Sequence, residues 1–247
     1  MRVSISPLGK TQPFCFTCSP KVACFNACCR DLQQALTPYD VLCLKQFLAL
    51  SSGDFLSAYT DASVGPETGL PVVSLRFRAA DDLACPFVGE SGCLVYPARP
   101  ASCRTYPLAR GIARDRQTGQ LTEHWAMIRE PHCLGFDAGE THTVGAWVKN
   151  QQIADHNRMN DKMLELISQK NRYRPGPLPP DEYRSVYIAL YDLDRFRDRC
   201  LRSLGSTPIV DPRDIERAGN DDVALLDVAI TWIRHTVLTV SKGGTKE

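Results

Sequence analysis

The stretch CSPKVACFNACCR, residues 18–30, carries four cysteines at Cys18, Cys24, Cys28 and Cys29. Crowding of this kind is expected of a metal site, because thiolates are soft ligands that favour zinc or iron–sulfur centres over Mg²⁺ or Ca²⁺. A site also needs several such ligands brought together from short loops. We therefore expect the N-terminal part of the chain to fold around a metal.

A second cysteine group lies farther along the chain, at Cys85, Cys93 and Cys103, and is followed by Cys133. Proline and glycine punctuate the residues between these cysteines, which predicts loops wrapped around a metal centre and not a hydrogen-bonded ladder of strands. Residues 108–129 predict a β-hairpin that turns near residues 116–119. Such a hairpin would return the chain from Cys103 towards Cys133 and close the site.

The adjacent pair Cys28-Cys29 limits how these thiols can be used. Neighbouring side chains point to opposite faces of an extended chain and diverge by about 100° on a helix, so both thiols hardly serve one tetrahedral zinc. Either they serve two adjacent centres or a polynuclear cluster, or only one of them is a ligand. His132, beside Cys133, is the only imidazole placed to replace a thiolate.

Two simpler interpretations of the cysteines compete with metal binding. The odd total of 11 leaves at least one thiol without a disulfide partner, and the N-terminus lacks the apolar segment of a secretory signal. Disulfides are therefore disfavoured. Cysteines can also act as small buried hydrophobic residues, which suits Cys43 and Cys200 but not the eight clustered ones.

Composition predicts an ordinary protein of the cytoplasm. The 247 residues carry a net charge of +1, which offers no general attraction to nucleic acid. The most apolar C-terminal stretch, residues 223–240, contains Asp227, Arg234 and His235, so it predicts an amphipathic helix and no membrane span.

The expected fold class is α+β and mainly helical. It has a small, irregular, cysteine-rich metal-binding core with a short strand and hairpin element, followed by C-terminal helices. Thr37 is a plausible N-cap for a helix just after the first cysteine group. The proline-rich stretch at 174–180 predicts a connector between a cysteine-cluster domain, residues 1–173, and a helical C-terminal extension, residues 181–247. Residues 181–204 predict one helix, and Asn220 is expected to cap a final helix.

The cysteines stand in a series of motifs: Cys24-Phe25-Asn26-Ala27-Cys28-Cys29-Arg30, Cys85-Pro86-Phe87, Gly92-Cys93-Leu94-Val95-Tyr96, Arg99-Pro100 and Cys103-Arg104-Thr105-Tyr106-Pro107. Over roughly residues 14–150 these motifs resemble a known family, the YkgJ-type cysteine-cluster proteins, regarded as zinc- or iron-chelating and including flagellin lysine N-methylase. The resemblance implies a metal-binding set of Cys18, Cys24, Cys28, Cys29, Cys85, Cys93, Cys103 and Cys133. The family usually opens with CxxCxxCC, whereas the spacing here is longer, so either Cys15 or Cys18 takes the first position; we favour Cys18.

The expected function is therefore chelation of a metal by eight cysteines, with an iron–sulfur cluster such as 4Fe-4S first and Zn²⁺ second. One alternative is a metal-dependent protein lysine N-methyltransferase resembling flagellin methylase; another is a structural zinc domain that presents its helices to a partner. No S-adenosylmethionine loop and no catalytic residue are recognisable, so the resemblance carries no warrant for the methylase activity. The expected partners are a protein substrate or a redox partner. Arg30, Arg99 and above all Arg104, beside Cys103, are expected to offset the thiolate charge and to donate hydrogen bonds to sulfur.

Overall fold

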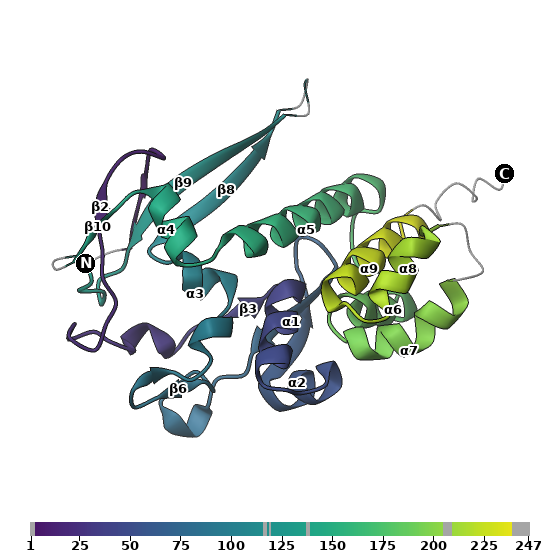
Figure 1. The fold of residues 1–247 in the computed structure, drawn as a ribbon, viewed down its shortest axis with the longest axis horizontal. Coiled ribbons are helices and arrows are strands. Elements are labelled where there is room, and N and C mark those ends of the chain that lie inside the picture. Colours follow the sequence, from purple (N-terminus) through teal and green to yellow (C-terminus); the bar gives the residue numbers. More distant parts are fainter. Residues whose placement is uncertain (1–2, 116–117, 119, 137–138, 205–208, 239–247) are drawn as a thin grey trace. The chain divides into compact units, whose positions relative to one another are not determined.

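The computed structural model describes residues 3–115, 118, 120–136, 139–204 and 209–238, and the chain divides into two compact units (Figure 1). The first unit combines residues 1–32 and 77–155, and the second combines residues 33–76 and 156–247. All eight predicted ligands belong to the first unit. These divisions do not coincide with the connector expected at 174–180, and independent folding of residues 1–173 stays a prediction.

The first unit is built on the predicted hairpin. Strands β8 and β9 pair antiparallel from Leu108 opposite Met127 to Arg114 opposite Leu121, and β1 adds to the other edge of β9 (Figure 1). The hairpin is thus confirmed, although most of its expected turn lies outside the described residues. The elements are β1 (Ser4–Pro7), β2 (Phe14–Cys15), η1 (Ala27–Cys29), η2 (Ala79–Asp81), β6 (Val88–Gly89), β7 (Gly92–Cys93), η3 (Tyr96–Ala98), α3 (Ala101–Thr105), β8 (Leu108–Arg114), β9 (Leu121–Arg129), β10 (Thr141–His142) and α4 (Val144–Asn150).

An aromatic core supports the cysteine-bearing loops of this unit. Phe16 is 3% exposed, and its ring makes edge or tilted contacts with those of Tyr106, Phe136 and Trp147 at centroid distances of 5.1–5.7 Å. Edge contacts of this kind add to the free energy gained by burying the rings. Cys133 and Tyr106 pack against the same aromatic cluster, which therefore fixes the positions of one thiol and one hydroxyl.

The second unit is mainly helical, as the sequence predicts. Its first helix, α1, begins with a capping box in which Thr37 Oγ1 accepts from Asp40 N and the Asp40 carboxylate accepts from Thr37 N. This arrangement satisfies amides that the first turn leaves free and explains why the helix begins there. The elements are β3 (Ala35–Leu36), α1 (Pro38–Phe47), α2 (Ser52–Tyr59), β4 (Thr60–Val64), β5 (Pro71–Leu75), α5 (Ala154–Tyr173, beginning at the end of the first unit), α6 (Pro180–Leu190), α7 (Leu193–Leu204), α8 (Pro212–Ala218) and α9 (Asp222–Thr236).

The single helix expected over residues 181–204 is wrong, because the structure has two helices there, α6 and α7. The Asp192 carboxylate accepts a hydrogen bond from the Arg195 amide, and its carbonyl accepts one from Phe196, so Asp192 starts a new helix. Likewise Asp221, and not Asn220, caps α9. Within the described residues, no helix combines the length and apolarity that crossing a membrane requires.

Candidate metal centre

Successive turns arrange the first cysteine group. Backbone hydrogen bonds run from Val22 N to Ser19 O, from Phe25 N to Val22 O and from Ala27 N to Cys24 O, each at 2.9–3.0 Å. Asn26 then adopts a left-handed conformation, φ 66°, which asparagine tolerates better than most residues, and begins the short helix η1. The cysteines therefore project from a coiled loop.

A second segment brings Cys133 beside this loop. The Thr17 amide donates to Gly135 O at 2.9 Å, and the Leu134 amide donates to the sulfur of Cys24 at 3.1 Å. The approach is close enough that a Cβ on Gly135 would collide with the backbone oxygen of Thr17. Glycine at position 135 is what lets the two segments touch.

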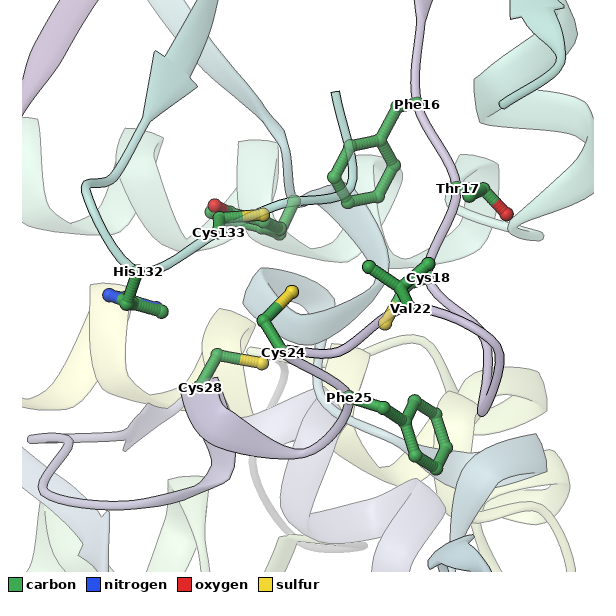
Figure 2. A pocket seen from close by; sticks show the side chains of 10 residues that line it. Phe16, Thr17, Cys18, Val22, Cys24, Phe25, Cys28, His132 and Cys133 are labelled. Carbon is green, nitrogen blue, oxygen red and sulfur yellow. The ribbon is translucent and has the colours of Figure 1, made fainter. Parts of the chain in front are cut away.

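Four thiols surround the small cavity that results. Cys18, Cys24 and Cys28 come from the first loop and Cys133 from the second (Figure 2). The volume is about 30 Å³, which is enough to admit at least one water molecule. The other lining residues are mostly apolar, namely Phe16, Thr17, Val22, Phe25, Tyr106 and His132.

The other four cysteines gather through a different set of contacts. Residues 29–31 run antiparallel to residues 83–85, and the Cys85 amide donates to Cys29 O at 2.8 Å. Cys85 is followed by the hairpin β6–β7, in which Val88 pairs with Cys93. The thiol of Cys103, on α3, lies close enough to that of Cys29 to raise its pKa.

The state of the thiols is set by burial and by their mutual contacts. Burial raises the pKa of Cys18 to about 11, and the thiols of Cys28, Cys24 and Cys133 add to the shift. A hydrogen bond from the Cys29 thiol lowers the pKa of Cys28 to about 7, against the effect of burial. Since most of these thiols keep their protons at neutral pH, a metal that binds them must displace protons.

Cationic and hydroxyl donors accompany the thiols. Arg99 is buried, donates to Tyr96 O at 2.8 Å and to the Gln151 side chain, and has no carboxylate partner among the described residues. Burial lowers its pKa, and the Cys93 and Cys103 thiols lie close enough to oppose that shift. A positive group without a counterion beside thiols is suited to balance thiolate charge.

Tyr106 contributes a buried hydroxyl that has no hydrogen-bond partner among the described residues. Burial raises its pKa, and the neighbouring thiol of Cys133 and carboxyl of Glu130 raise it further. Sequence reasoning included Tyr106 in a motif but gave it no role. Its position beside the proline that follows Cys103 carries no signal that the hydroxyl lies next to Cys133.

The role expected of Arg104 toward sulfur stays a prediction. Its guanidinium donates to the carbonyls of Arg99 at 2.9 Å, Gln151 at 3.0 Å and Pro97. Arg104 thus fastens the loop that carries Arg99, while Arg99 and Arg78 are close enough to thiols to affect their charge.

The remaining candidates from the sequence fall outside the two groups. Cys15, on β2, is exposed, and its sulfur lies 3.5 Å from Oγ1 of Thr141 on β10. It does not line the cavity. His132 lines the cavity, but its ring faces the Glu130 carboxylate at 3.7 Å and its side chain is 44% exposed. Cys43 lies on α1 in the second unit. The Cys200 side chain is not described.

One histidine has a partner that the sequence did not predict. The Nδ1 atom of His156 lies 3.0 Å from Asp40 Oδ1, and both side chains are buried in the second unit. Asp40 also caps α1, so this pair has a structural role away from the thiols.

The donor set fits a thiolate metal centre. Four thiols around one cavity, the unpartnered Tyr106 hydroxyl and the unpaired Arg99 guanidinium together match what such a centre requires. Among the described residues, no three His, Cys, Asp or Glu side chains already converge closely enough to hold an ion. Binding must therefore draw the side chains together, which is common where metal binding and folding are linked.

Comparison with known proteins gives the family. The model of the CxxCxxCC family, described as "Putative zinc- or iron-chelating domain", matches residues 17–133. The matched segment includes all eight clustered cysteines and begins after Cys15. No curated protein and no solved structure matches the chain. The segment from residue 17 to residue 133 is thus the part of this chain that matches the CxxCxxCC family.

Proposed function

We propose that the protein chelates a metal through Cys18, Cys24, Cys28, Cys29, Cys85, Cys93, Cys103 and Cys133, and that the metal is an iron–sulfur cluster. The observation that carries the proposal is the cavity lined by four thiols from two separate segments. Thiolates alone suit both iron–sulfur clusters and zinc. We favour iron because the adjacent Cys28 and Cys29 side chains diverge, which suits a centre of several metal atoms better than one zinc ion. Tyr106 and Arg99 lie beside the thiols and could donate to sulfur in either case.

Zinc is the second candidate, because four cysteine thiolates are also a common ligand set of structural zinc sites. In that form the protein would be a structural zinc domain.

Anaerobic purification, elemental analysis and a visible absorption spectrum test the proposal. An iron–sulfur protein shows broad absorption that bleaches on reduction, whereas a zinc protein is colourless. A full-length protein that contains neither metal when purified, and takes up neither when reconstituted, would contradict the proposal.

The pair Cys18→Ser and Cys15→Ser supplies a matched test of the ligand set. The two residues are both classed as exposed and lie three positions apart, but of the two only Cys18 lines the cavity. We expect Cys18→Ser to lose metal and Cys15→Ser to retain it. The reverse result would move the first ligand to Cys15.

A further inference from the structure

We propose that the eight cysteines form two separate four-thiolate centres, with Cys28 a ligand of one and Cys29 a ligand of the other. The first centre is Cys18, Cys24, Cys28 and Cys133, and the second is Cys29, Cys85, Cys93 and Cys103. This inference rests on the proposed function and deepens it.

The first set is defined by the cavity. Its four side chains all line one space (Figure 2). The amide of Leu134 donates to the sulfur of Cys24 and so holds the segment of Cys133 against the first loop. Gly135 and Thr17 close the same side of the cavity through their backbone hydrogen bond. The segments that carry Cys24 and Cys133 are thus held together by contacts that do not involve the other four cysteines.

The second set is defined by backbone pairing on the other side of η1. The Cys85 amide donates a hydrogen bond to the carbonyl of Cys29, and the Cys85 carbonyl accepts one from the amide of Val88. Val88 is in turn the strand partner of Cys93. Cys103 reaches the set from α3, whose loop is fastened by Arg104.

The local helix explains why the pair is shared between sets. Cys28 and Cys29 lie in η1, a 3-10 helix, where successive side chains leave the axis about 120° apart. One tetrahedral metal uses four ligands, and eight thiols supply two such sets. The hydrogen bond between the Cys28 and Cys29 thiols joins the sets at one point, so the two metals would be neighbours.

The two sets also differ in their surroundings. Tyr106 and Glu130 accompany the first set, and Arg78 lies near Cys85 of the second. Arg99 is close to Cys93 and Cys103 of the second set and also to Cys18 of the first. Two centres in unlike electrostatic environments are expected to differ in affinity and, with iron, in reduction potential.

Titration of the reduced, metal-free, full-length protein with Co²⁺ tests the inference. Cobalt bound by four thiolates has a strong sulfur-to-metal absorption that counts occupied sites. We expect two Co²⁺ per chain in the wild type. We expect half of that uptake, one Co²⁺, both in Cys24→Ser/Cys133→Ser and in Cys85→Ser/Cys93→Ser. The control Cys15→Ser/Cys43→Ser should keep both.

Other results would contradict either the two-centre inference or the proposed function, and they distinguish between the two. One Co²⁺ per chain in the wild type, or loss of all uptake in both double variants, would overturn the two-centre inference and leave the proposed function intact. No uptake of Co²⁺ and no metal in the purified wild type would refute the proposed function itself. Cadmium NMR of the wild type avoids any dependence on variants that fail to fold: two four-sulfur resonances support the inference, and one overturns it.

Discussion

At the residue scale, the Tyr106 hydroxyl can donate a hydrogen bond that it does not make to any described residue. It is buried without a partner among the described residues, and the Cys133 thiol is its neighbour. A donor to a cluster thiolate stabilises the reduced, more negative state. In the iron-loaded protein, Tyr106→Phe should therefore lower the midpoint potential by on the order of tens of millivolts with unchanged iron content.

A redox titration measures this shift, and Tyr96→Phe is the control because that side chain is 56% exposed. Equal potentials in the wild type and in Tyr106→Phe would show that the hydroxyl does not face the cluster.

Gly135 provides a second residue-scale prediction. A Cβ there would meet the backbone oxygen of Thr17 and, at 2.8 Å, the ring of Phe16. Gly135→Ala should push Cys133 away from Cys18 and Cys24 at a cost of about 1–3 kcal/mol, lowering metal affinity roughly tenfold or more. Competition with a chromophoric chelator measures the affinity.

Gly145→Ala is the matched control, because a Cβ there meets nothing within 4 Å on helix α4. It should leave affinity unchanged and add about 0.5–1 kcal/mol to helix stability. Equal affinities for the two variants would mean that the close approach at Gly135 is irrelevant to the metal.

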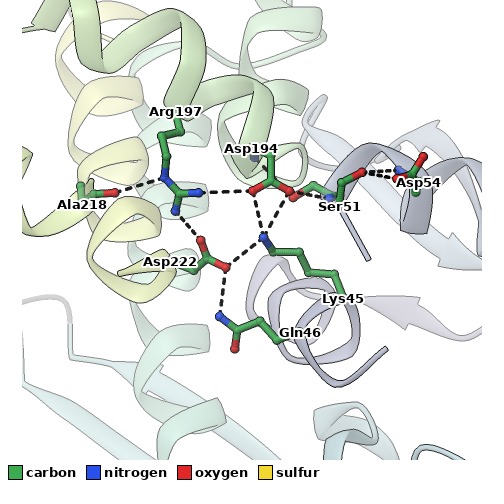
Figure 3. Close-up of polar contacts among 9 residues, drawn as sticks. Lys45, Gln46, Ser51, Asp54, Asp194, Arg197, Ala218 and Asp222 are labelled. Carbon is green, nitrogen blue, oxygen red and sulfur yellow. Dashed lines mark hydrogen bonds and ion pairs between the residues drawn. The ribbon is translucent and has the colours of Figure 1, made fainter. Parts of the chain in front are cut away.

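At the element scale, one ion-pair network ties four helices of the second unit together (Figure 3). Lys45 on α1 contacts Asp194 on α7 at 3.0 Å and Asp222 on α9 at 2.9 Å. Asp194 also accepts from the Ser52 amide at the start of α2, and Arg197 bridges both carboxylates. The Lys45 side chain is 7% exposed, so its loss would leave two carboxylates facing each other with less compensation.

Lys45→Met should therefore destabilise the protein by about 2 kcal/mol at neutral pH, a value below that of a fully buried pair because Asp194 is partly exposed. Lys162→Met is the control: its pair with Asp227 is 35% and 41% exposed and should contribute below about 1 kcal/mol. Urea unfolding followed by circular dichroism gives both values. Equal losses would show that burial of the network adds nothing.

Acid should weaken the same network. Burial tends to raise the pKa of Asp194 and of Asp222, but hydrogen bonds outweigh it and lower both pKa values below 3.8. Asp194 accepts from Ser52 and Lys45. Asp222 accepts from Arg197 and Lys45. A carboxylate with a lowered folded-state pKa adds stability above its unfolded pKa, which is lost as the pH falls through the folded value. Wild-type stability should thus fall below about pH 4, and the fall should be smaller in Lys45→Met when unfolding is repeated at each pH.

How far the sequence predicts these elements depends on how local their causes are. The capping box at Thr37 and the hairpin from Leu108 to Arg129 depend on neighbours in sequence, and both are confirmed. The break at Asp192 and the contacts of Arg104 depend on distant backbone groups, which a linear pattern does not reveal. The same holds for the candidate site: spacing identifies eight cysteines, but only the fold divides them between two sets.

At the scale of the whole molecule, all eight cysteines belong to one of two units. The segments that bear them contain only short elements, such as β6, β7 and η1 of two or three residues. The second unit instead has a core of long helices, with Leu225 and Ile233 fully buried. Binding of a structural metal supplies roughly 10–16 kcal/mol in small domains, comparable to the whole stability of a domain.

Removing the metal should therefore affect the two units unequally. With the metal removed by a chelator under reducing conditions, amide hydrogen exchange should accelerate in residues 18–31, 83–105 and 130–136, since their order depends on ligation. Exchange in α1, α6 and α9 should stay slow, because their protection comes from apolar packing that no metal supports. Mass spectrometry of peptides from the full chain resolves the two regions. Loss of protection throughout would mean that the units unfold as one, and unchanged exchange in the cysteine segments would mean that the loops are ordered without metal.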